Sequence, residues 1–413
     1  MAMATVRIDD TLIDPGLFPA NHGPPHALFD LWREQDPVHW NPPNPAYAPP
    51  MPGMRLDKGF WVLTRYKDVF DVSMNQDLFS SHEAGIVVWD SDEQDLAIQR
   101  ANFMAMLPAD HAAVRRVLAA PFMPKALAAI TLEIEQLARE IVDGIAPRGE
   151  CEFVSEAAAR LPVYTFCELM GIPPELRERV AELGNAMADV ETRGARDVDP
   201  MVGLAAIALE LAAEKRRNPD GRLMSAMVND TTLNLSDLSI VQFFMVFAMA
   251  GHETTRSSAV HFFQLMSEHP DQYAALREDF EGQIDNAIDE VLRYTSTTTN
   301  FRRTATRDTE IGGFRVKAGD KVYLSYAAAN RDPAVFEDPH RFDILRSNAK
   351  RHLAFGAGPH VCLGARLAKI QLRALIGEVV RRLPDIHPVG EPEWLRSIWF
   401  NAIIRMPVAF TPA

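Results

Sequence analysis

The stretch from Phe355 to Gly364, FGAGPHVCLG, constrains this 413-residue chain more than any other feature. Two glycines flank a single alanine and a proline follows, so the stretch predicts a tight loop that is neither helix nor strand. A helical pattern begins directly afterwards and runs from Ala365 to Arg382. Cys362 is therefore expected just before a helix N-terminus, where free backbone N–H groups and the helix dipole favour a thiolate.

The chain has two further cysteines, Cys151 and Cys167, and no CxxC pair. An odd, sparse set argues against a disulfide scaffold and for a reducing cytoplasm, with both of these cysteines as buried structural thiols. The formal net charge of −14 argues against nucleic acid as a partner. We expect no membrane segment, since the N-terminus lacks a signal-like apolar region and the most apolar run, 240–251, is too short to span a bilayer.

A long helix is predicted from Ser236 to about His269, with Ser236 as N-cap and Pro270 as its stop. About 33 residues span roughly 50 Å, the width of a large domain. Its middle is apolar on nearly all sides, yet it carries Ala250-Gly251-His252-Glu253-Thr254-Thr255. A buried glutamate is costly unless it is paired or used, so this segment is a candidate functional site.

Two pairs of ionisable residues are spaced so that each pair lies on one face of a predicted helix. Glu290 and Arg293 are three residues apart within a predicted helix over 284–294, and His111 and Arg115 are four apart in a helix over 111–118. Each spacing is common by chance, so each gains meaning only from its place in the chain.

The remaining sequence predicts a mainly α protein with a smaller β-rich region, forming one domain over 1–413. Residues 1–53 are rich in proline and are expected to wrap over the surface as loops. Residues 60–64 predict a strand, and a β-rich patch over 303–323 contains a hairpin turn at Gly312-Gly313. Further helices are predicted over 126–145, 174–191 and 201–216.

Taken together, these elements resemble the cytochrome P450 superfamily. The family's haem-binding consensus, Phe-Gly-x-Gly-x-His-x-Cys-x-Gly, is matched at every specified position of 355–364. The order of basic helix, acid–alcohol helix, Glu-x-x-Arg, basic strand and cysteine loop is also that of the family. The resemblance implies a bacterial, soluble type with a triangular, single-domain haem-thiolate fold and haem b as the cofactor.

The same resemblance assigns roles around the haem. It implies that Cys362 is the axial iron ligand and that basic side chains contact the two propionates. Glu290 and Arg293 should form a buried structural ion pair. The propionate contacts would be His111, Arg115, Arg303 and His360, and the residues around the haem would include Phe355, Gly356, Gly364, Ala250 and Gly251.

On the long helix, the small Ala250-Gly251 step would leave room for dioxygen, and Thr254 and Glu253 would help to deliver protons. Many bacterial members carry Asp at the position of Glu253, a difference that should preserve the chemistry. From the residues alone, Thr254 could instead bond back to the carbonyl of Ala250, as threonine within a helix often does.

The function implied is a monooxygenase that uses O2 to hydroxylate or epoxidise a hydrophobic molecule. Electrons would come from an external ferredoxin and its reductase, docking near Arg116, Arg366 and Lys369. The alternatives are a peroxygenase, which usually lacks the acid–alcohol pair, and a non-catalytic haem-thiolate sensor, which needs neither Thr254 nor Glu253.

Family position suggests which residues line the substrate pocket. The set is apolar and offers no charge to an acidic head group unless Arg302 turns inward, so it favours a neutral terpenoid or steroid-like substrate over a fatty acid. The expected lining is Ile86, Val87, Val88, Phe243, Phe244, Phe247, Thr297, Thr298, Thr299, Trp399 and Phe400.

Overall fold

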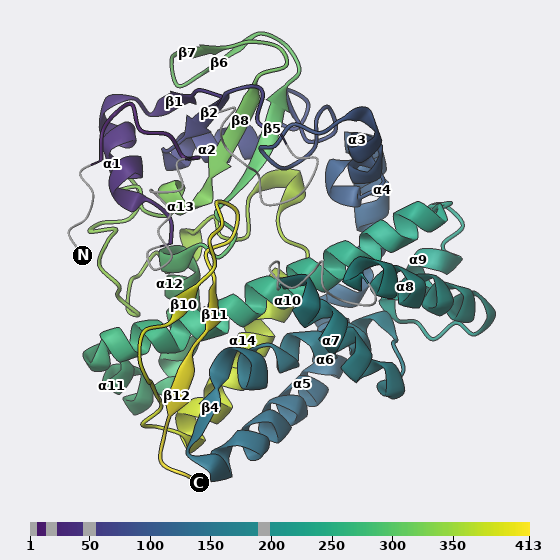
Figure 1. Cartoon of the computed structure of the whole chain (residues 1–413), viewed down its shortest axis with the longest axis vertical. Helices are drawn as coiled ribbons and strands as arrows, with labels where there is room; N and C mark the ends of the chain where they lie inside the picture. The colour runs from purple at the N-terminus through teal and green to yellow at the C-terminus, as the bar shows by residue number, and fades with distance from the viewer. Residues whose placement is uncertain (1–5, 14–22, 44–54, 189–198) are drawn as a thin grey trace.

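The fold was analysed in a computed structural model, which describes residues 6–13, 23–43, 55–188 and 199–413. A β-rich part lies at the top of Figure 1 and a larger helical part lies below it. The helices are α1 His26–Gln35, α2 Tyr66–Met74, α3 Glu93–Arg100, α4 Pro108–Leu118, α5 Pro124–Ile145, α6 Arg160–Met170, α7 Arg177–Ala188, α8 Pro200–Arg217, α9 Leu223–Asn229, α10 Asp237–Glu268, α11 Pro270–Glu278, α12 Phe280–Thr295, α13 Tyr326–Ala329 and α14 Ala365–Arg382. The strands are β1 Val38–Asn41, β2 Phe60–Leu63, β3 Phe79–Ser80, β4 Glu150–Glu152, β5 Asn300–Ala305, β6 Thr309–Ile311, β7 Phe314–Val316, β8 Lys321–Ser325, β9 His387–Pro388, β10 Glu393–Trp394, β11 Ile403–Arg405 and β12 Pro407–Ala409.

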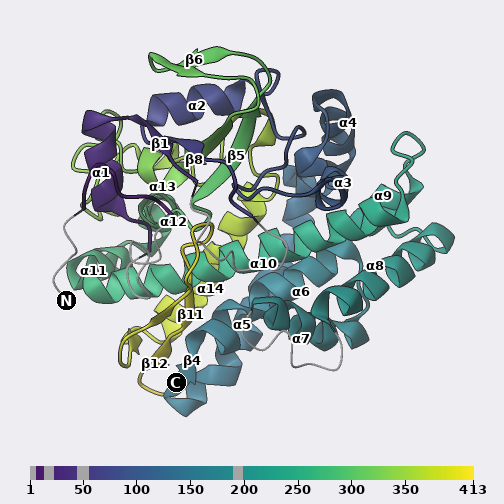
Figure 2. The ribbon, with the colours of Figure 1, turned by 45° about the horizontal axis from the view of Figure 1, so that its top comes forward.

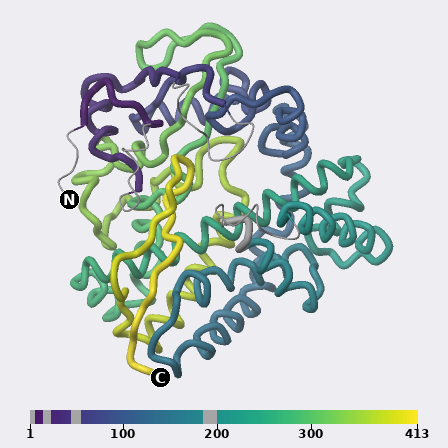
Figure 3. The backbone as a smooth tube through the Cα atoms, in the orientation of Figure 1, coloured from purple at the N-terminus to yellow at the C-terminus, as the bar shows by residue number. Residues whose placement is uncertain are grey.

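The main sheet has the strand order β1-β2-β8-β5-β3. β2 pairs with β8 in parallel, so residues near position 60 lie beside residues near position 322, as the neighbouring purple and green tubes of Figure 3 show. β8 pairs antiparallel with β5. This sheet therefore brings N-terminal segments next to the strand that carries Arg302 and Arg303.

The predicted hairpin is confirmed at β6 and β7. Gly312 and Gly313 connect the two strands with φ of 57° and 92°. Two successive residues with positive φ are what a type I′ hairpin turn requires, and glycine adopts them without strain.

Helix α10 crosses the molecule in both ribbon views (Figures 1 and 2). The predicted limits are confirmed within one residue, and the Ser236 hydroxyl caps the helix by accepting a hydrogen bond from the Ser239 N–H. The helix packs against α6, α8, α12 and α14. Its C-terminal half is almost entirely buried, although it carries polar residues such as Arg256, Ser257 and His261.

The first 53 residues were predicted to be loops, and this was wrong for part of the segment. Helix α1 forms directly after Pro24-Pro25, and β1 follows it. Leu28, Phe29 and Trp32 are buried in a second core cluster beneath the sheet. Proline is tolerated where a helix begins, so the proline-rich composition hid a periodic apolar stripe. The prolines at 45, 49, 50 and 52 lie outside the described residues.

Among the residues that the structure describes, no helix is both long enough and apolar enough to cross a bilayer.

Candidate active site

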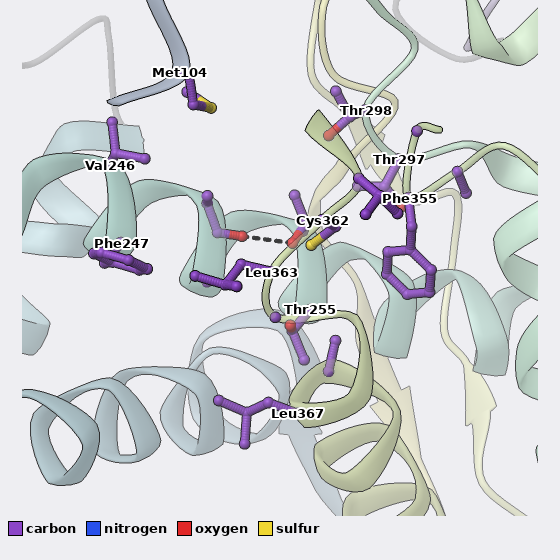
Figure 4. Close-up of a pocket in the computed structure, with 18 of the residues that line it drawn as sticks. Met104, Val246, Phe247, Thr255, Thr297, Thr298, Phe355, Cys362, Leu363 and Leu367 are labelled. Atoms are coloured by element: carbon purple, nitrogen blue, oxygen red, sulfur yellow. Dashed lines mark hydrogen bonds between the residues drawn. The ribbon is translucent and has the colours of Figure 1, made fainter. Parts of the chain in front are cut away.

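A large cavity lies between α10 and the loop that precedes α14. Its empty volume is about 1540 Å³, including the part that opens to solvent. In Figure 4 the sulfur of Cys362 faces a space surrounded by side chains from several distant segments, among them Met104, Val246 and Thr298. The fold thus assembles one site from residues more than 250 positions apart.

The cysteine loop is shaped by its glycines. Gly356 and Gly358 both have φ of 69°, the left-handed region that other residues rarely adopt. A Cβ on Gly358 would lie 2.5 Å from the carbonyl oxygen of Ser73, so glycine also allows the loop to approach the end of α2. The Cys362 N–H donates to the carbonyl of Phe355 at 2.8 Å, which closes the loop just before α14 begins.

Cys362 is accessible from the cavity, yet the surrounding protein affects its charge. Burial raises the pKa of its thiol, while the N–H groups of Gly364 and Ala365 and the charge of Arg115 act in the opposite direction. The N–H groups at the start of α14 thus favour the thiolate, as the sequence predicted, but burial of the loop has the larger effect on the pKa. A coordinated metal ion deprotonates a thiol directly, so the site suits a thiol that ligates a metal.

Four basic side chains gather on one side of the cavity: His111, Arg115, Arg303 and His360 all line it. The two imidazole rings stack with centroids 4.1 Å apart, and Arg115 donates to the carbonyl of Val361. Arg303 is buried, and its Nη1 donates to the carbonyl of Arg302 at 2.8 Å.

No aspartate or glutamate lines this cavity within the part of the chain that the structure describes. Burial and the neighbouring arginines lower the pKa of His111 to about 4, and the His111 Nε2 atom is buried without a hydrogen-bond partner. Arg115 and Arg303 remain charged in this cluster, and buried cations without an acid require an anionic partner. The two carboxylates of haem fit this requirement, and Cys362 fits the iron, so the residues present suit the cofactor that the resemblance implies.

Helix α10 forms the opposite wall through Ala250, Gly251, Thr254 and Thr255. A Cβ on Gly251 would meet no atom within 4 Å, so the helix leaves open space there. The Thr254 hydroxyl donates to the carbonyl of Ala250 at 2.6 Å, the alternative that its mid-helix position left open. Thr254 nonetheless lines the cavity.

Glu253, the expected partner of Thr254, does not line the cavity. Its Oε1 accepts from Arg256 Nη2 at 2.6 Å and from the Ser257 hydroxyl at 3.2 Å. The carboxylate is thus held by two side chains from the next turn of the same helix.

Glu290 and Arg293 pair directly in the core below the cavity. Arg293 Nε and Nη2 contact the two Glu290 oxygens at 2.7 and 2.8 Å, and both residues are 0 % exposed. Arg346 adds a second cation at 3.2 Å, and Arg293 Nη1 donates to the carbonyls of Asn330 and Pro339. Every charged atom of this pair is therefore satisfied by a short contact, as a buried ion pair requires.

The expected substrate wall is only partly correct. Ile86, Phe247, Thr297 and Thr298 line the cavity. The other expected residues do not line it, and they are Val87, Val88, Phe243, Phe244, Thr299, Trp399 and Phe400.

These residues form a second layer behind the wall. The ring of Phe103 lies 5.4 Å from that of Phe243 and 5.7 Å from that of Phe247, so Phe103 takes the place expected for Phe243. Phe244 packs against Phe166, and Val88 is buried in the core cluster beneath the sheet. Trp399 stands edge-on to Phe301, which does line the cavity, and Phe400 packs against Trp399; Thr299 instead bonds the carbonyl of Ile398.

Sequence reasoning missed Phe103, Met104, Val246 and Phe301. A signal for Val246 existed, because positions 246, 247, 250, 251 and 254 share one face of a helix. Phe103 and Met104 lie between α3 and α4, where the resemblance to the family is weakest, and no local pattern marks them.

Arg302 points away from the cavity. Its guanidinium Nη1 donates to the carbonyls of Val87 and Trp89, at 3.3 and 3.1 Å. It cannot anchor an acidic head group in this arrangement. Beyond the basic cluster, the wall is apolar apart from neutral polar side chains.

Known proteins resemble the chain over nearly its whole length. The family model for cytochrome P450 matches residues 205–384. A steroid C26-monooxygenase of Mycolicibacterium smegmatis is 33 % identical over 94 % of this chain and 91 % of that protein. A methyl-branched lipid omega-hydroxylase of Mycobacterium tuberculosis is 33 % identical over 87 % of this chain and 86 % of that protein.

Solved structures agree with the fold. Mycobacterium marinum cytochrome P450 CYP268A2 in complex with pseudoionone superposes with a TM-score of 0.87, at 34 % identity, over 98 % of this chain and 100 % of that one. Both the cavity with its cysteine loop and the full-length relatives lead to the same assignment. The chain belongs to the bacterial cytochrome P450 family and is a haem-dependent monooxygenase.

Proposed function

We propose that this P450 oxidises a neutral, hydrophobic molecule of the steroid, terpenoid or branched-lipid type in the cavity above Cys362. The observation that carries the proposal is the distribution of charge around this cavity. Its basic side chains gather in one cluster suited to the haem carboxylates, and the described residues of its remaining wall offer no charged group to a substrate. Relatives named for steroids and methyl-branched lipids, and a neighbour that holds pseudoionone, support the same class.

In this proposal the Cys362 sulfur would ligate the haem iron. The four basic side chains of the cluster, from α4, β5 and the cysteine loop, would hold the two propionates. Haem with a thiolate ligand supplies oxygen activation, because the thiolate increases electron density at the iron and favours O–O cleavage.

The residues of α10 manage protons. The Thr254 hydroxyl can leave the Ala250 carbonyl by rotation about χ1 and then donate a hydrogen bond into the cavity. Glu253, one residue earlier and held by Arg256 and Ser257, can take up a proton from water once it leaves those contacts and pass it on through water toward Thr254. The open space at Gly251 accommodates a small molecule beside the Thr254 hydroxyl.

External proteins supply the electrons. We propose a ferredoxin with its reductase, docking on the cysteine-loop side. Arg116 and Arg366 are exposed there, whereas Lys369 is paired with Asp289 at 2.5 Å and is a weaker candidate. The three cysteines are free thiols, in keeping with a cytoplasmic location.

The substrate proposal is tested by spectral titration of the haem-loaded enzyme with three probe classes: steroids, branched-chain lipids and straight-chain fatty acids. We expect neutral steroid-like or branched molecules to shift the iron spin state at lower concentrations than fatty acids of equal carbon number. Tighter binding of the fatty acids would contradict the proposal.

The proton role is tested with Thr254→Ala. Loss of the hydroxyl should leave haem binding intact but divert electrons from product to hydrogen peroxide. Thr254→Ser keeps the hydroxyl and is the matched control. Equal product yield per NAD(P)H in the alanine variant and the parent would argue against this role.

A further inference from the structure

The segment Ile86–Asp90 forms part of the cavity wall without regular secondary structure. Ile86 faces the cavity, while Val88 and Trp89 are buried against the core cluster beneath the sheet. Irregular backbone in a buried position must find partners for its polar groups outside a strand or helix. Asp90, at the end of the segment, pairs with the backbone of Arg55 at 2.7 and 3.4 Å. The carbonyls of the other four residues are bonded by two buried basic residues.

Arg302, on β5, satisfies three carbonyls of the segment. Its backbone N–H donates to Ile86 at 2.8 Å, and its Nη1 donates to Val87 and Trp89 at 3.3 and 3.1 Å. The residue is only 3 % exposed. Its guanidinium therefore bonds carbonyls of the segment and does not reach solvent.

Lys321, at the start of β8, provides the remaining contacts. Its Nζ donates to the carbonyl of Val88 at 3.2 Å and contacts the Asp90 carboxylate at 2.6 Å. Asp90 also accepts from the N–H groups of Asp57 and Lys58 at 2.9 and 3.2 Å. Four successive carbonyls, 86–89, and the following carboxylate are thus all bonded.

The buried charges of Arg302 and Lys321 are compensated mainly by groups of segment 86–90. Arg302 and Lys321 are both buried, and Asp90 is the carboxylate that pairs with Lys321. Burial, together with the nearby charges of Arg302 and Lys58, lowers the pKa of Lys321 to about 8, although Asp90 opposes the shift. Two cations beside one acid are retained because the backbone carbonyls accept the remaining hydrogen bonds.

We propose that Arg302 and Lys321 are positioning residues that fix segment 86–90, and with it Ile86, as a rigid wall of the substrate pocket. The inference rests on the proposed substrate site above Cys362. A fixed wall selects substrates by shape, so adjustment to a substrate must come from the other walls, which carry Met104 and Phe247. Without the two cations the segment would open and Ile86 would lose its position.

The test is hydrogen–deuterium exchange of the haem-loaded protein, read at peptides covering 86–90. Lys321→Met leaves the buried carbonyl of Val88 without its donor and removes the cation beside Asp90, and it should speed local exchange by about tenfold or more. Lys321→Arg keeps the cation and should restore slow exchange. Asp320→Asn is the matched control: its carboxylate is adjacent in sequence but binds Trp61 and Lys317, not the segment.

If Lys321→Met does not give a folded haem protein, Asp90→Asn takes its place, since it only removes the charge of the partner carboxylate. Exchange at 86–90 equal to that of the parent in the folded variant would overturn the proposal. Faster exchange throughout the molecule would also overturn it, because that result marks a general loss of stability.

A pseudoionone titration of the same proteins separates this inference from the proposed function. Lys321→Met should bind pseudoionone about tenfold more weakly than the parent and the Asp320→Asn control do. A tenfold change in affinity is about what the loss of one hydrogen bond or of one packing contact causes. If pseudoionone shifts the spin state of none of these proteins, the substrate class is in doubt, while the exchange result still decides whether the segment is fixed.

Discussion

Arg302 and Arg303 are neighbours on β5 with opposite surroundings. Both are buried, and burial lowers the pKa of both side chains. Because successive residues of a strand point to opposite faces, one guanidinium faces segment 86–90 and the other faces the haem cavity. Arg302 binds carbonyls of that segment, whereas Arg303 stands beside Arg115 and two histidines, and no acidic side chain among the described residues lines the cavity.

The difference separates structural from ligand-binding cations. A buried arginine cannot release its proton, so it needs an acceptor from the protein or from a ligand. Arg302 has its acceptors within the chain. Arg303 has one, the carbonyl of Arg302, and we propose that the haem carboxylates supply the remaining partner for Arg303 and the partner for His111 Nε2.

Arg293 is a third buried cation, and its partner is the carboxylate of Glu290. Removing the charge of that carboxylate should give the largest loss of stability among these predictions. Glu290→Gln leaves Arg293 and Arg346 buried beside a neutral amide, and it should lower the free energy of unfolding by about 3–5 kcal/mol. The measurement is urea unfolding followed by circular dichroism. Glu281→Gln is a control from the same helix: its pair with Arg373 is exposed, so the loss should stay below about 1 kcal/mol. Similar losses in the two variants would contradict the account of buried charge.

The second effect should fall on haem retention. Arg303→Met removes one propionate contact and should weaken haem binding by about a hundredfold, since breaking a buried charge pair costs several kcal/mol. Haem transfer to apomyoglobin measures it. Arg302→Met should keep haem at close to the parent level, because its side chain faces segment 86–90. Equal haem loss from both variants would remove the distinction between the two arginines.

A buried histidine, unlike a buried arginine, can lose its proton and so avoid the cost of a buried charge. The resulting dependence of stability on pH is the smallest of the predicted effects. Burial lowers the pKa of His261 to about 4, although its hydrogen bond to the Asn401 carbonyl opposes the shift. Between pH 6.5 and pH 4 the unfolded chain binds a proton at this residue and the folded chain does not, so stability falls as the pH falls. From pH 6.5 to pH 5 the expected loss is about 2 kcal/mol.

His261→Gln removes this contribution while keeping a side-chain donor near Asn401. Urea midpoints measured at several pH values should therefore decline less steeply for the variant than for the parent. Parallel declines would show that His261 titrates alike in the folded and unfolded states.

The sequence predicted the haem side of the molecule better than the substrate side. The cysteine loop, α10 and the Glu-x-x-Arg pair lie in local patterns whose spacing determines their geometry, and the structure brings these segments together around the cavity. Residues such as Phe103 and Met104 reach the cavity from an irregular connection. Their position depends on tertiary packing, which no periodicity encodes.

Tertiary packing explains two more features that the sequence did not predict. Val87 and Val88 are apolar and close to Ile86, but the bonds to Arg302 and Lys321 fix the backbone so that Ile86 is the residue of the three that lines the cavity. The N–H groups at the start of α14 lower the pKa of the Cys362 thiol as predicted, while the burial of the loop raises it. The wall position and this burial arise only when distant segments pack together.

The central claim is that the Cys362 sulfur ligates the haem iron, and the carbon monoxide spectrum of the reduced protein tests it most directly. The parent should show the long-wavelength Soret band of thiolate-ligated haem, and Cys362→His should bind haem but show the band of a histidine-ligated protein. A histidine-type spectrum from the parent, or a thiolate-type spectrum from Cys362→His, would contradict the account.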